Sequence, residues 1–258
     1  MSKRALRIVS LLATALVVTG CSGFFGSWFG PQREAWRSEA ESRCLASGQV
    51  RVTAYVQAMT EYDGPGACGA DRPFRVSAFG DGAVGVRPTA SLNCPMTAAL
   101  DTWIQQVVQP QAMATVGQPV TEIKVLASYG CRRINGRAYG SMSEHAYMNA
   151  LDVGSFVFAD GSEASVLKGY RANGSPAQAF LQGVGAESCS IFNTVIGPDG
   201  DAQHQDHFHL DLAQRRSGKY CRGAPAGHGG AMSYAAPGFD PTVLLGVHDH
   251  GPDDVHDD

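Results

Sequence analysis

Four histidines in two short segments are the residues of this chain best suited to chemistry. They are the only histidines up to residue 227, and both segments also contain carboxylates. The first segment has His145 and Asp152 in the spacing H-x6-D, and the second has H-x-H at His207 and His209. This spacing supplies possible metal ligands with acid and base groups beside them, which is the composition of a catalytic zinc site.

The second segment is informative because residues 207–212 are expected to form a strand. Side chains alternate between the two faces of a strand, so His207, His209 and Asp211 share one face. The residues between them point to the other face, toward the core: Phe208, Leu210 and Leu212. If the polar face is buried, it needs a partner such as a metal, and Asp211 then fixes the tautomer of a ligating imidazole. An exposed polar face on an edge strand is the alternative.

The first segment joins a loop to a strand. Residues 150–158 are expected to form a strand that carries Asp152, and His145 lies in the loop before it. The six intervening residues let this loop fold back so that both side chains reach one ion. Taken singly, an ordinary loop histidine and a turn aspartate are alternatives, but their joint occurrence favours a site. Three protein ligands leave a fourth position for water, as a hydrolytic zinc site requires.

The first segment resembles a known signature. Ser143-x-His145-x4-Ala150-x-Asp152 is similar to the SxHxxGxAxD motif of zinc peptidases in the D-alanyl-D-alanine carboxypeptidase, lysostaphin and hedgehog superfamily. The whole stretch 44–222 resembles the bacterial extensin-like C-terminal domain family. The segments that carry this second resemblance are 128–132, 143–146, 149–153, 206–211 and 220–222.

The resemblance implies a role for each residue of the two segments. The implied zinc ligands are His145, Asp152 and His209. The implied general base is either Asp206, three positions before the last ligand, or His207, the first histidine of H-x-H. Both stay open, because Asp206 serves as base only if the chain bends before His207 and brings it within reach of the reacting water. His204, five positions before the last ligand, is a third candidate.

Two further positions concern the substrate and the shape of the loop. Superfamily enzymes use an upstream arginine to steady the substrate or the developing oxyanion, so Arg132 is the candidate substrate-binding residue. A surface arginine beside a disulfide is the alternative. Met148 stands where the signature has glycine, which permits positive φ. The shape of this loop is therefore where the chain departs from the signature.

The N-terminus has the pattern of an export signal. A basic start precedes an apolar run at 8–18, which is short for a membrane span. The run ends in Val18-Thr19-Gly20-Cys21, which resembles the bacterial lipobox, and Ser22 resembles the outer-membrane sorting signal of Gram-negative lipoproteins. We therefore expect a signal peptide at 1–20, lipid attachment to Cys21 and an outer membrane lipoprotein that faces the periplasm. An ordinary secretory peptide is the alternative.

The six cysteines that remain besides Cys21 indicate disulfides, because an even number after an export signal is typical of an oxidising compartment. Cys189 and Cys221 bracket the H-x-H segment, so we expect them to pair. A cysteine zinc site is disfavoured, since the chain has no C-x2-C pair. The net charge of −4 provides no basic field for nucleic acid.

The chain is expected to divide into a tether at 21–43, one domain at 44–222 and a disordered tail rich in His and Asp at 223–258. Further strands are expected at 50–56, 74–78, 122–128 and 165–167, and helices at 95–108 and 175–181. Pro110 should end or kink the first helix. The predicted fold is α+β, with a small antiparallel sheet that carries the zinc site, packed against helices and stabilised by disulfides.

These features predict a zinc-dependent hydrolase of peptide or amide bonds in peptidoglycan, anchored to a membrane by lipid. One alternative is a non-catalytic module that binds or supports the cell wall, in which zinc stabilises the fold. Another is a periplasmic metal carrier that uses the histidines of the tail, although a solvated tail is the simpler interpretation.

Overall fold

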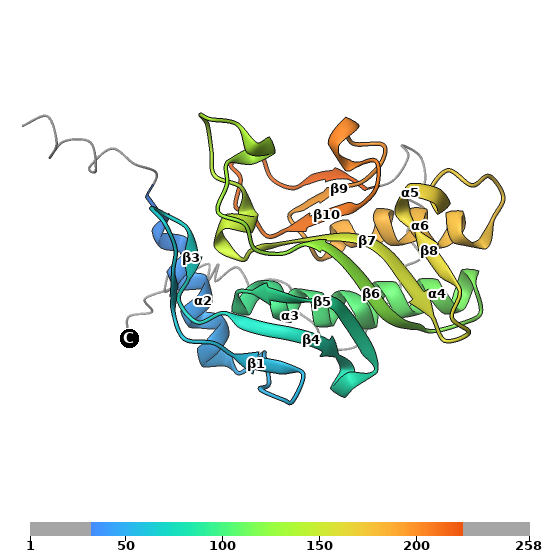
Figure 1. Ribbon diagram of the computed structural model, residues 1–258, viewed down its shortest axis with the longest axis horizontal. Helices are drawn as coiled ribbons and strands as arrows, with labels where there is room; N and C mark the ends of the chain where they lie inside the picture. The colour runs from blue at the N-terminus through green and yellow to red at the C-terminus, as the bar shows by residue number, and fades with distance from the viewer. Residues whose placement is uncertain (1–31, 224–258) are drawn as a thin grey trace, which may run out of the picture. The chain divides into compact units, whose positions relative to one another are not determined.

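The computed structural model describes residues 32–223, and a large mixed β-sheet runs through this part of the chain. Within these residues the sheet has nine strands in the order β1-β4-β5-β6-β7-β10-β9-β11, with β8 paired to β7 (Figure 1). The predicted signal peptide, Cys21 and the tail beyond residue 223 lie outside the described residues. No helix within the described range combines the length and apolar character needed to cross a membrane.

The strands of the sheet are β1 (Val56–Ala58), β4 (Phe74–Phe79), β5 (Val84–Leu92), β6 (Val120–Ala127), β7 (Ala150–Phe158), β8 (Glu163–Ser165), β9 (Thr194–Ile196), β10 (Phe208–Asp211) and β11 (Tyr220–Arg222). A separate two-stranded sheet consists of β2 (Tyr62–Asp63) and β3 (Gly69–Ala70). The α-helices are α2 (Ala35–Ser47), α3 (Cys94–Trp103), α4 (Gln109–Thr115), α5 (Val166–Gly169) and α6 (Pro176–Glu187). The shorter helices are η1 (Gly80–Gly82), η2 (Ile104–Val108), η3 (Ile134–Gly136), η4 (Glu144–Tyr147), η5 (Ser188–Ser190) and η6 (Ala202–His204).

The α+β class is confirmed, but the expected small antiparallel sheet is wrong in size and in strand direction. Strands β5 and β6 are parallel, because the helical crossover of α3, η2 and α4 returns the chain to the same end of the sheet. Strand β11 is parallel to β9. The sequence pattern did not predict β5, since Pro88 and Gly85 interrupt its apolar residues.

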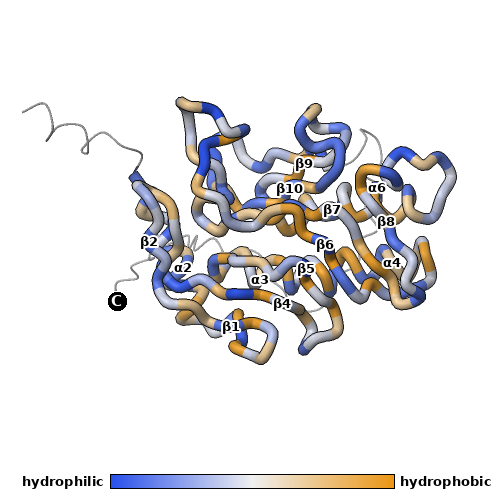
Figure 2. Tube along the Cα trace, viewed as in Figure 1, coloured by the Kyte–Doolittle hydropathy of each residue, from blue (hydrophilic) through white to orange (hydrophobic). Residues whose placement is uncertain are grey.

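The hydrophobic core lies on one face of the sheet, and the period-two alternation of β7 and β10 directs side chains toward it. The buried residues that these two strands contribute include Leu151, Val153, Phe208 and Leu210. Figure 1 shows α3, α4 and α6 running across one face of the sheet, and residues of all three helices belong to the same core. Figure 2 shows hydrophobic stretches along β6 and β7 and hydrophilic ones in the loops near β9 and β10.

The first long helix continues past the proline that was expected to end or kink it. After α3, the chain passes through η2, a π-helical segment, and remains helical to Thr115. Pro110 has no backbone N–H to donate, and it is the second residue after the π-helical segment, where the hydrogen-bond pattern of the helix changes. The predicted start of α6 at Ser175 is confirmed, since its hydroxyl accepts from the backbone N of Gln178 at 3.0 Å.

Helix α2 corrects the predicted tether, because residues 35–43 of that segment are helical and belong to the folded domain. Arg37, Glu41 and Cys44 of this helix are buried. The helix has few apolar residues, and their spacing gives little sign of a buried face. Its attachment comes from partners far along the chain, which a local pattern does not reveal.

Three disulfides link the elements, and the predicted pair Cys189–Cys221 is one of them. This bridge joins η5 to β11, the strand that pairs with β9 at the edge of the sheet. Cys44–Cys94 joins α2 to α3, and Cys68–Cys131 joins the small sheet to the loop after β6. Because bridges between distant residues restrict the unfolded chain, each should contribute several kcal/mol, roughly 2–4, to stability.

Candidate metal centre

The register of β7 and β10 places His209 directly opposite Asp152. The neighbouring cross-strand pairs are Phe208 with Val153 and Leu210 with Leu151, whose side chains are in the core. Residues directly opposite each other in an antiparallel pair share a face. His209 and Asp152 therefore lie together on the face of the sheet that points away from the core.

His145 reaches this face from η4, the short helix before β7. Its ring Nδ1 donates to the backbone carbonyl of Ser128 at 2.9 Å, which turns Nε2 toward Asp152. The hydroxyl of Ser143 caps the helix by accepting from the backbone N of His145 at 3.4 Å. The loop therefore folds back onto the strand, as the spacing between His145 and Asp152 predicts.

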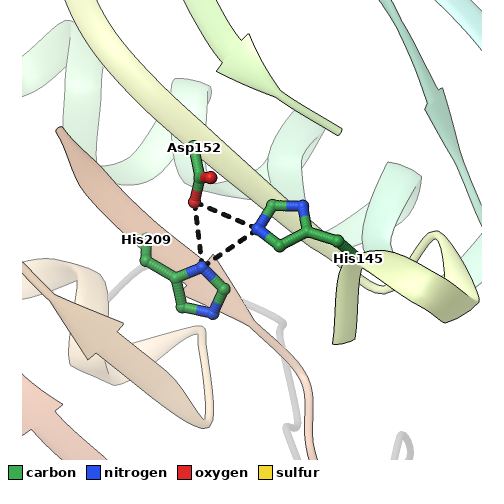
Figure 3. A group of neighbouring side chains, drawn as sticks. All are labelled: His145, Asp152 and His209. Atoms are coloured by element: carbon green, nitrogen blue, oxygen red, sulfur yellow. Dashed lines mark hydrogen bonds and ion pairs between the residues drawn. The ribbon is translucent and has the colours of Figure 1, made fainter. Parts of the chain in front are cut away.

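The three predicted ligands converge on one point (Figure 3). His145 Nε2 lies 3.1 Å from Asp152 Oδ1, and His209 Nδ1 lies 2.9 Å from the same oxygen. The two ring nitrogens are 3.2 Å apart. Ligand atoms about 2.0–2.1 Å from a tetrahedral zinc ion are separated by roughly 3.3 Å, so the spacing of the three atoms fits such an ion with little adjustment.

In both imidazoles the ring nitrogen that points away from the other two side chains donates a hydrogen bond, and this fixes the protonation of the nitrogen that faces them. His209 Nε2 donates to Asp211 Oδ2 at 2.9 Å, and His145 Nδ1 donates to the carbonyl of Ser128. In neutral histidines the inner nitrogens then carry lone pairs and face the Asp152 oxygen. Three acceptor atoms about 3 Å apart repel one another unless a cation lies between them. A metal ion or a shared proton meets this requirement.

The charges of the centre shift its pKa values in a consistent direction. Burial alone would raise the pKa of Asp152, but hydrogen bonds and charges from His145 and His209 outweigh burial and hold that pKa below its usual range. Burial alone would lower the pKa of His209, but Asp152 and Asp211 raise it to about 9. Without metal, His209 therefore carries the shared proton. A metal that binds must displace this proton, so binding becomes pH-dependent.

His207 lies beside the three ligands, and Asp206 lies behind it. His207 Nε2 is 3.7 Å from Asp152 Oδ1, while its Nδ1 donates to Asp206 Oδ1 at 2.7 Å. Strand β10 begins only at Phe208, so the chain bends before it and Asp206 approaches the ring of its neighbour. The nearer of the two candidate bases is thus His207, with Asp206 bonded to its far side.

His204 lies next to His207 and His209. Its ring centroid is 5.0 Å from that of His207 and 5.8 Å from that of His209. Its Nδ1 donates to Asp201 Oδ1 at 2.6 Å, yet burial dominates and lowers the pKa of His204. His204 therefore lies beside His207 and His209 and is not among the three converging residues.

Met148 adopts the backbone conformation for which the signature glycine is suited. Its φ is 53° and its ψ is 27°, in the left-handed region, where it ends η4. Its side chain is 1 % exposed, so the strained residue is also a core residue. The loop thus has the positive-φ turn that glycine would permit, with methionine in its place.

Arg132 lies on the loop that supports His145, with its side chain exposed. Its backbone carbonyl accepts from the backbone N of Ser143 at 3.0 Å. Among residues 32–223, its guanidinium has no ion-pair or hydrogen-bond partner. A substrate-binding role for Arg132 stays a prediction.

Spacing in the sequence does not identify the residues that hold the turn around His145. Glu144 precedes His145 and forms an ion pair with Arg37, 107 residues earlier in the chain. Asn149 donates to Glu144 Oε2 at 2.7 Å, and Asn93 donates to Asn149 Oδ1 at 3.0 Å. The local signals are Glu144 and Asn149, which both lie inside the signature.

Comparison with known proteins identifies a family for most of the chain. A family model described as extensin-like protein C-terminus matches residues 42–222, which is most of the chain and nearly all of the described residues. No curated protein and no solved structure matches the chain. All three converging ligands, His207 and the cysteines of the three bridges lie within the matched residues. The chain therefore belongs to the extensin-like protein C-terminus family.

Proposed function

We propose that this protein is a zinc-dependent hydrolase that cleaves peptide or amide bonds in peptidoglycan. The observation that carries the proposal is the convergence of three acceptor atoms, from His145, Asp152 and His209, beside a fourth side chain suited to proton transfer. The relationship to the zinc peptidase superfamily, suggested by the signature around His145, is part of the same proposal.

Zinc would be held by His145 Nε2, Asp152 Oδ1 and His209 Nδ1. Two nitrogens and one oxygen form a donor set that catalytic zinc sites use, with a further position left for water or substrate. When bound, zinc supplies Lewis acidity and lowers the pKa of a coordinated water to about 7. Ser128 and Asp211 keep the two rings in the orientation that such binding needs.

His207 is the proposed general base and acid. Because its Nδ1–H is held by Asp206, its Nε2 has a free lone pair on the side of the ligands. That nitrogen would take a proton from the attacking water and return it to the leaving amine. Asp206 is a positioning residue in this scheme, since it acts through the imidazole. A correctly placed base of this kind contributes about 10²–10⁴ in rate.

The substrate and the location complete the proposal. Arg132 is exposed beside the His145 loop, where a guanidinium would bind a carboxylate or the developing oxyanion of a stem peptide. Lipid attachment at Cys21 would hold the domain on the outer membrane, facing the periplasm and the cell wall. Disulfides within the domain agree with an oxidising compartment.

Digestion of purified muropeptides, followed by mass spectrometry, tests the proposal together with zinc content. The wild-type domain should hold one zinc and release a defined fragment. His145→Ala should lose both zinc and activity, whereas His207→Ala should keep zinc and lose activity by about 10²–10⁴. This contrast separates loss of the metal from loss of proton transfer.

The alternative function is a non-catalytic module in which zinc stabilises the fold. It is favoured by the burial of the ligands, since His145 and Asp152 are only 2 % and 6 % exposed. A zinc-loaded wild-type domain that cuts no muropeptide would leave this alternative standing and refute hydrolysis of that substrate. A domain without affinity for zinc would refute both.

A further inference from the structure

Helix α2 carries a buried arginine that contacts the loop of the metal centre. Arg37 is 5 % exposed, and its two terminal nitrogens donate to Glu144 Oε2 at 2.7 Å and to Glu144 Oε1 at 2.9 Å. Its Nε donates to Glu34 Oε2 at 2.6 Å. The ion pair with Glu144 is bidentate, which is the geometry in which an arginine fixes the direction as well as the position of a carboxylate.

The same guanidinium also covers the aromatic ring at the other end of the turn. It lies 3.7 Å from the ring centroid of Tyr147 and 4.4 Å from that of Trp36. Glu144 and Tyr147 are the first and last residues of η4, and His145 lies between them. Arg37 therefore contacts both ends of the four-residue turn that presents His145.

A second set of hydrogen bonds holds the turn from the side of α3. Asn149 joins the turn to this helix, because it donates to Glu144 and accepts from Asn93. The backbone N of Asn93 donates to the carbonyl of Met148 at 2.8 Å. Asn93 is also the N-cap of α3, and the next residue, Cys94, is bridged to Cys44 of α2. The two helices and the turn thus form one connected unit.

We propose that Arg37 is a positioning residue of the metal centre, through which α2 fixes the orientation of His145. A neutral residue at position 37 would leave the carboxylate of Glu144, only 11 % exposed, without its countercharge. The turn would then relax, and His145 Nε2 would move away from Asp152 and His209. This inference rests on the proposed metal site and adds the device that holds the site in shape.

Zinc affinity, measured by competition with a chromophoric chelator, tests the inference in the full folded domain. Arg37→Gln should weaken zinc binding by about 10–100-fold, the usual effect of losing a residue that orients a ligand. Arg33→Gln is the matched control, because Arg33 pairs with Glu41 and, at 3.3 Å, with Asp71, outside the turn. The control should lose stability and keep the zinc affinity of the wild type.

Cobalt substitution provides a readout that a purely structural role would not move. The visible absorption of bound Co²⁺ reports the geometry of its ligands, so its bands should shift in Arg37→Gln and stay unchanged in Arg33→Gln. Arg37→Lys keeps the charge without the bidentate contact and should recover part of the affinity. If Arg37→Gln does not fold, Glu144→Gln removes the same ion pair and should show the same loss.

The outcomes separate this inference from the proposed function. Wild-type protein that binds no zinc would refute the proposed metal site. Wild-type protein that binds zinc, together with an Arg37→Gln variant of equal affinity and unchanged cobalt spectrum, would overturn the role of Arg37 alone. Equal losses in Arg37→Gln and Arg33→Gln would also overturn it, because the effect would then belong to the stability of α2.

Discussion

Individual imidazole nitrogens decide what the centre can hold. His209 is shared between Asp152 and Asp211, and these two carboxylates raise its pKa to about 9 despite its burial. A metal-free protein at neutral pH therefore carries a proton where the ion would lie. An ion bound there would compete with this proton for the same nitrogen, so its affinity would depend on pH.

The stability of the metal-free protein should depend on this histidine. The folded-state pKa of about 9 exceeds the unfolded value of roughly 6.5. The contribution of His209 is thus fully present below pH 6.5 and is lost as pH rises through 9. Urea unfolding with a chelator present should show a lower free energy of unfolding at pH 9.5 than at pH 6.5. The decrease in the free energy of unfolding between these pH values should be smaller in His209→Gln. An equal decrease in both proteins would contradict the raised pKa of His209.

At position 148, replacement by glycine should destabilise the protein less than replacement by alanine, which is the reverse of the usual order. Both Met148→Ala and Met148→Gly lose a buried side chain, at about 2–5 kcal/mol for alanine. Because φ at this position is 53°, glycine avoids the strain of the left-handed conformation. The Met148→Gly variant should therefore be more stable than Met148→Ala by about 1 kcal/mol. Chemical unfolding of the two variants measures the difference. Ala146→Gly, in the neighbouring 3-10 helix, is the control and should destabilise the fold.

The elements that could be predicted are those whose sequence pattern is local. The alternation of Asp152 with Leu151 and Val153, and of His209 with Phe208 and Leu210, places β7 and β10 and assigns their faces. The Ser175-Pro176 pair predicts the start of helix α6. What escaped prediction depends on distant partners: α2 is held by Glu144 and Cys94, and the β5–β6 pair by a helical crossover.

The same limit applies to the candidate site. The three converging side chains could be predicted from spacing and resemblance, because all of them lie in two short segments. The orientation of the His145 ring could not be predicted from spacing, because its partner is the backbone carbonyl of Ser128, which any residue type would provide. The different positions of Asp206 and His207 relative to the centre depend on where β10 begins, and a difference of one residue in strand length would change them.

The bridge Cys189–Cys221 should be a main support of the β9–β11 edge. It closes 32 residues of chain that include β10, and loss of such a loop closure costs about 4 kcal/mol. The double variant Cys189→Ser/Cys221→Ser should show this loss in chemical unfolding. Cys68→Ser/Cys131→Ser, with a separation of 63 residues, provides a comparison away from this edge. A loss below about 1 kcal/mol in the first variant would contradict the prediction.

For the whole molecule, zinc should act as a folding ligand. A ligand present at a thousand times its Kd stabilises the native state by about 4 kcal/mol. For a domain of this size, that corresponds to a rise in Tm of roughly 8–16 °C. Calorimetry of the wild type with and without zinc should show this rise, and Asp152→Ala should show none. An equal rise in both proteins would place the zinc elsewhere.

Truncation after Gly223 tests whether the domain needs the segment that follows. The converging ligands lie between residues 145 and 209, and the bridges end at Cys221. The truncated protein should therefore keep the zinc stoichiometry and affinity of the full chain in equilibrium dialysis. Loss of most of the bound zinc would instead favour the metal-carrier interpretation, in which His248, His250 and His256 bind the ion.

The register of β10 against β7 has a consequence for how this fold can change its chemistry. Every second residue of β10 belongs to the core, and the residues between belong to the centre. The apolar contacts of this strand pair therefore lie on the opposite face from His209 and Asp152. The packing of the apolar face and the chemistry of the polar face are thus set by different residues of the same two strands.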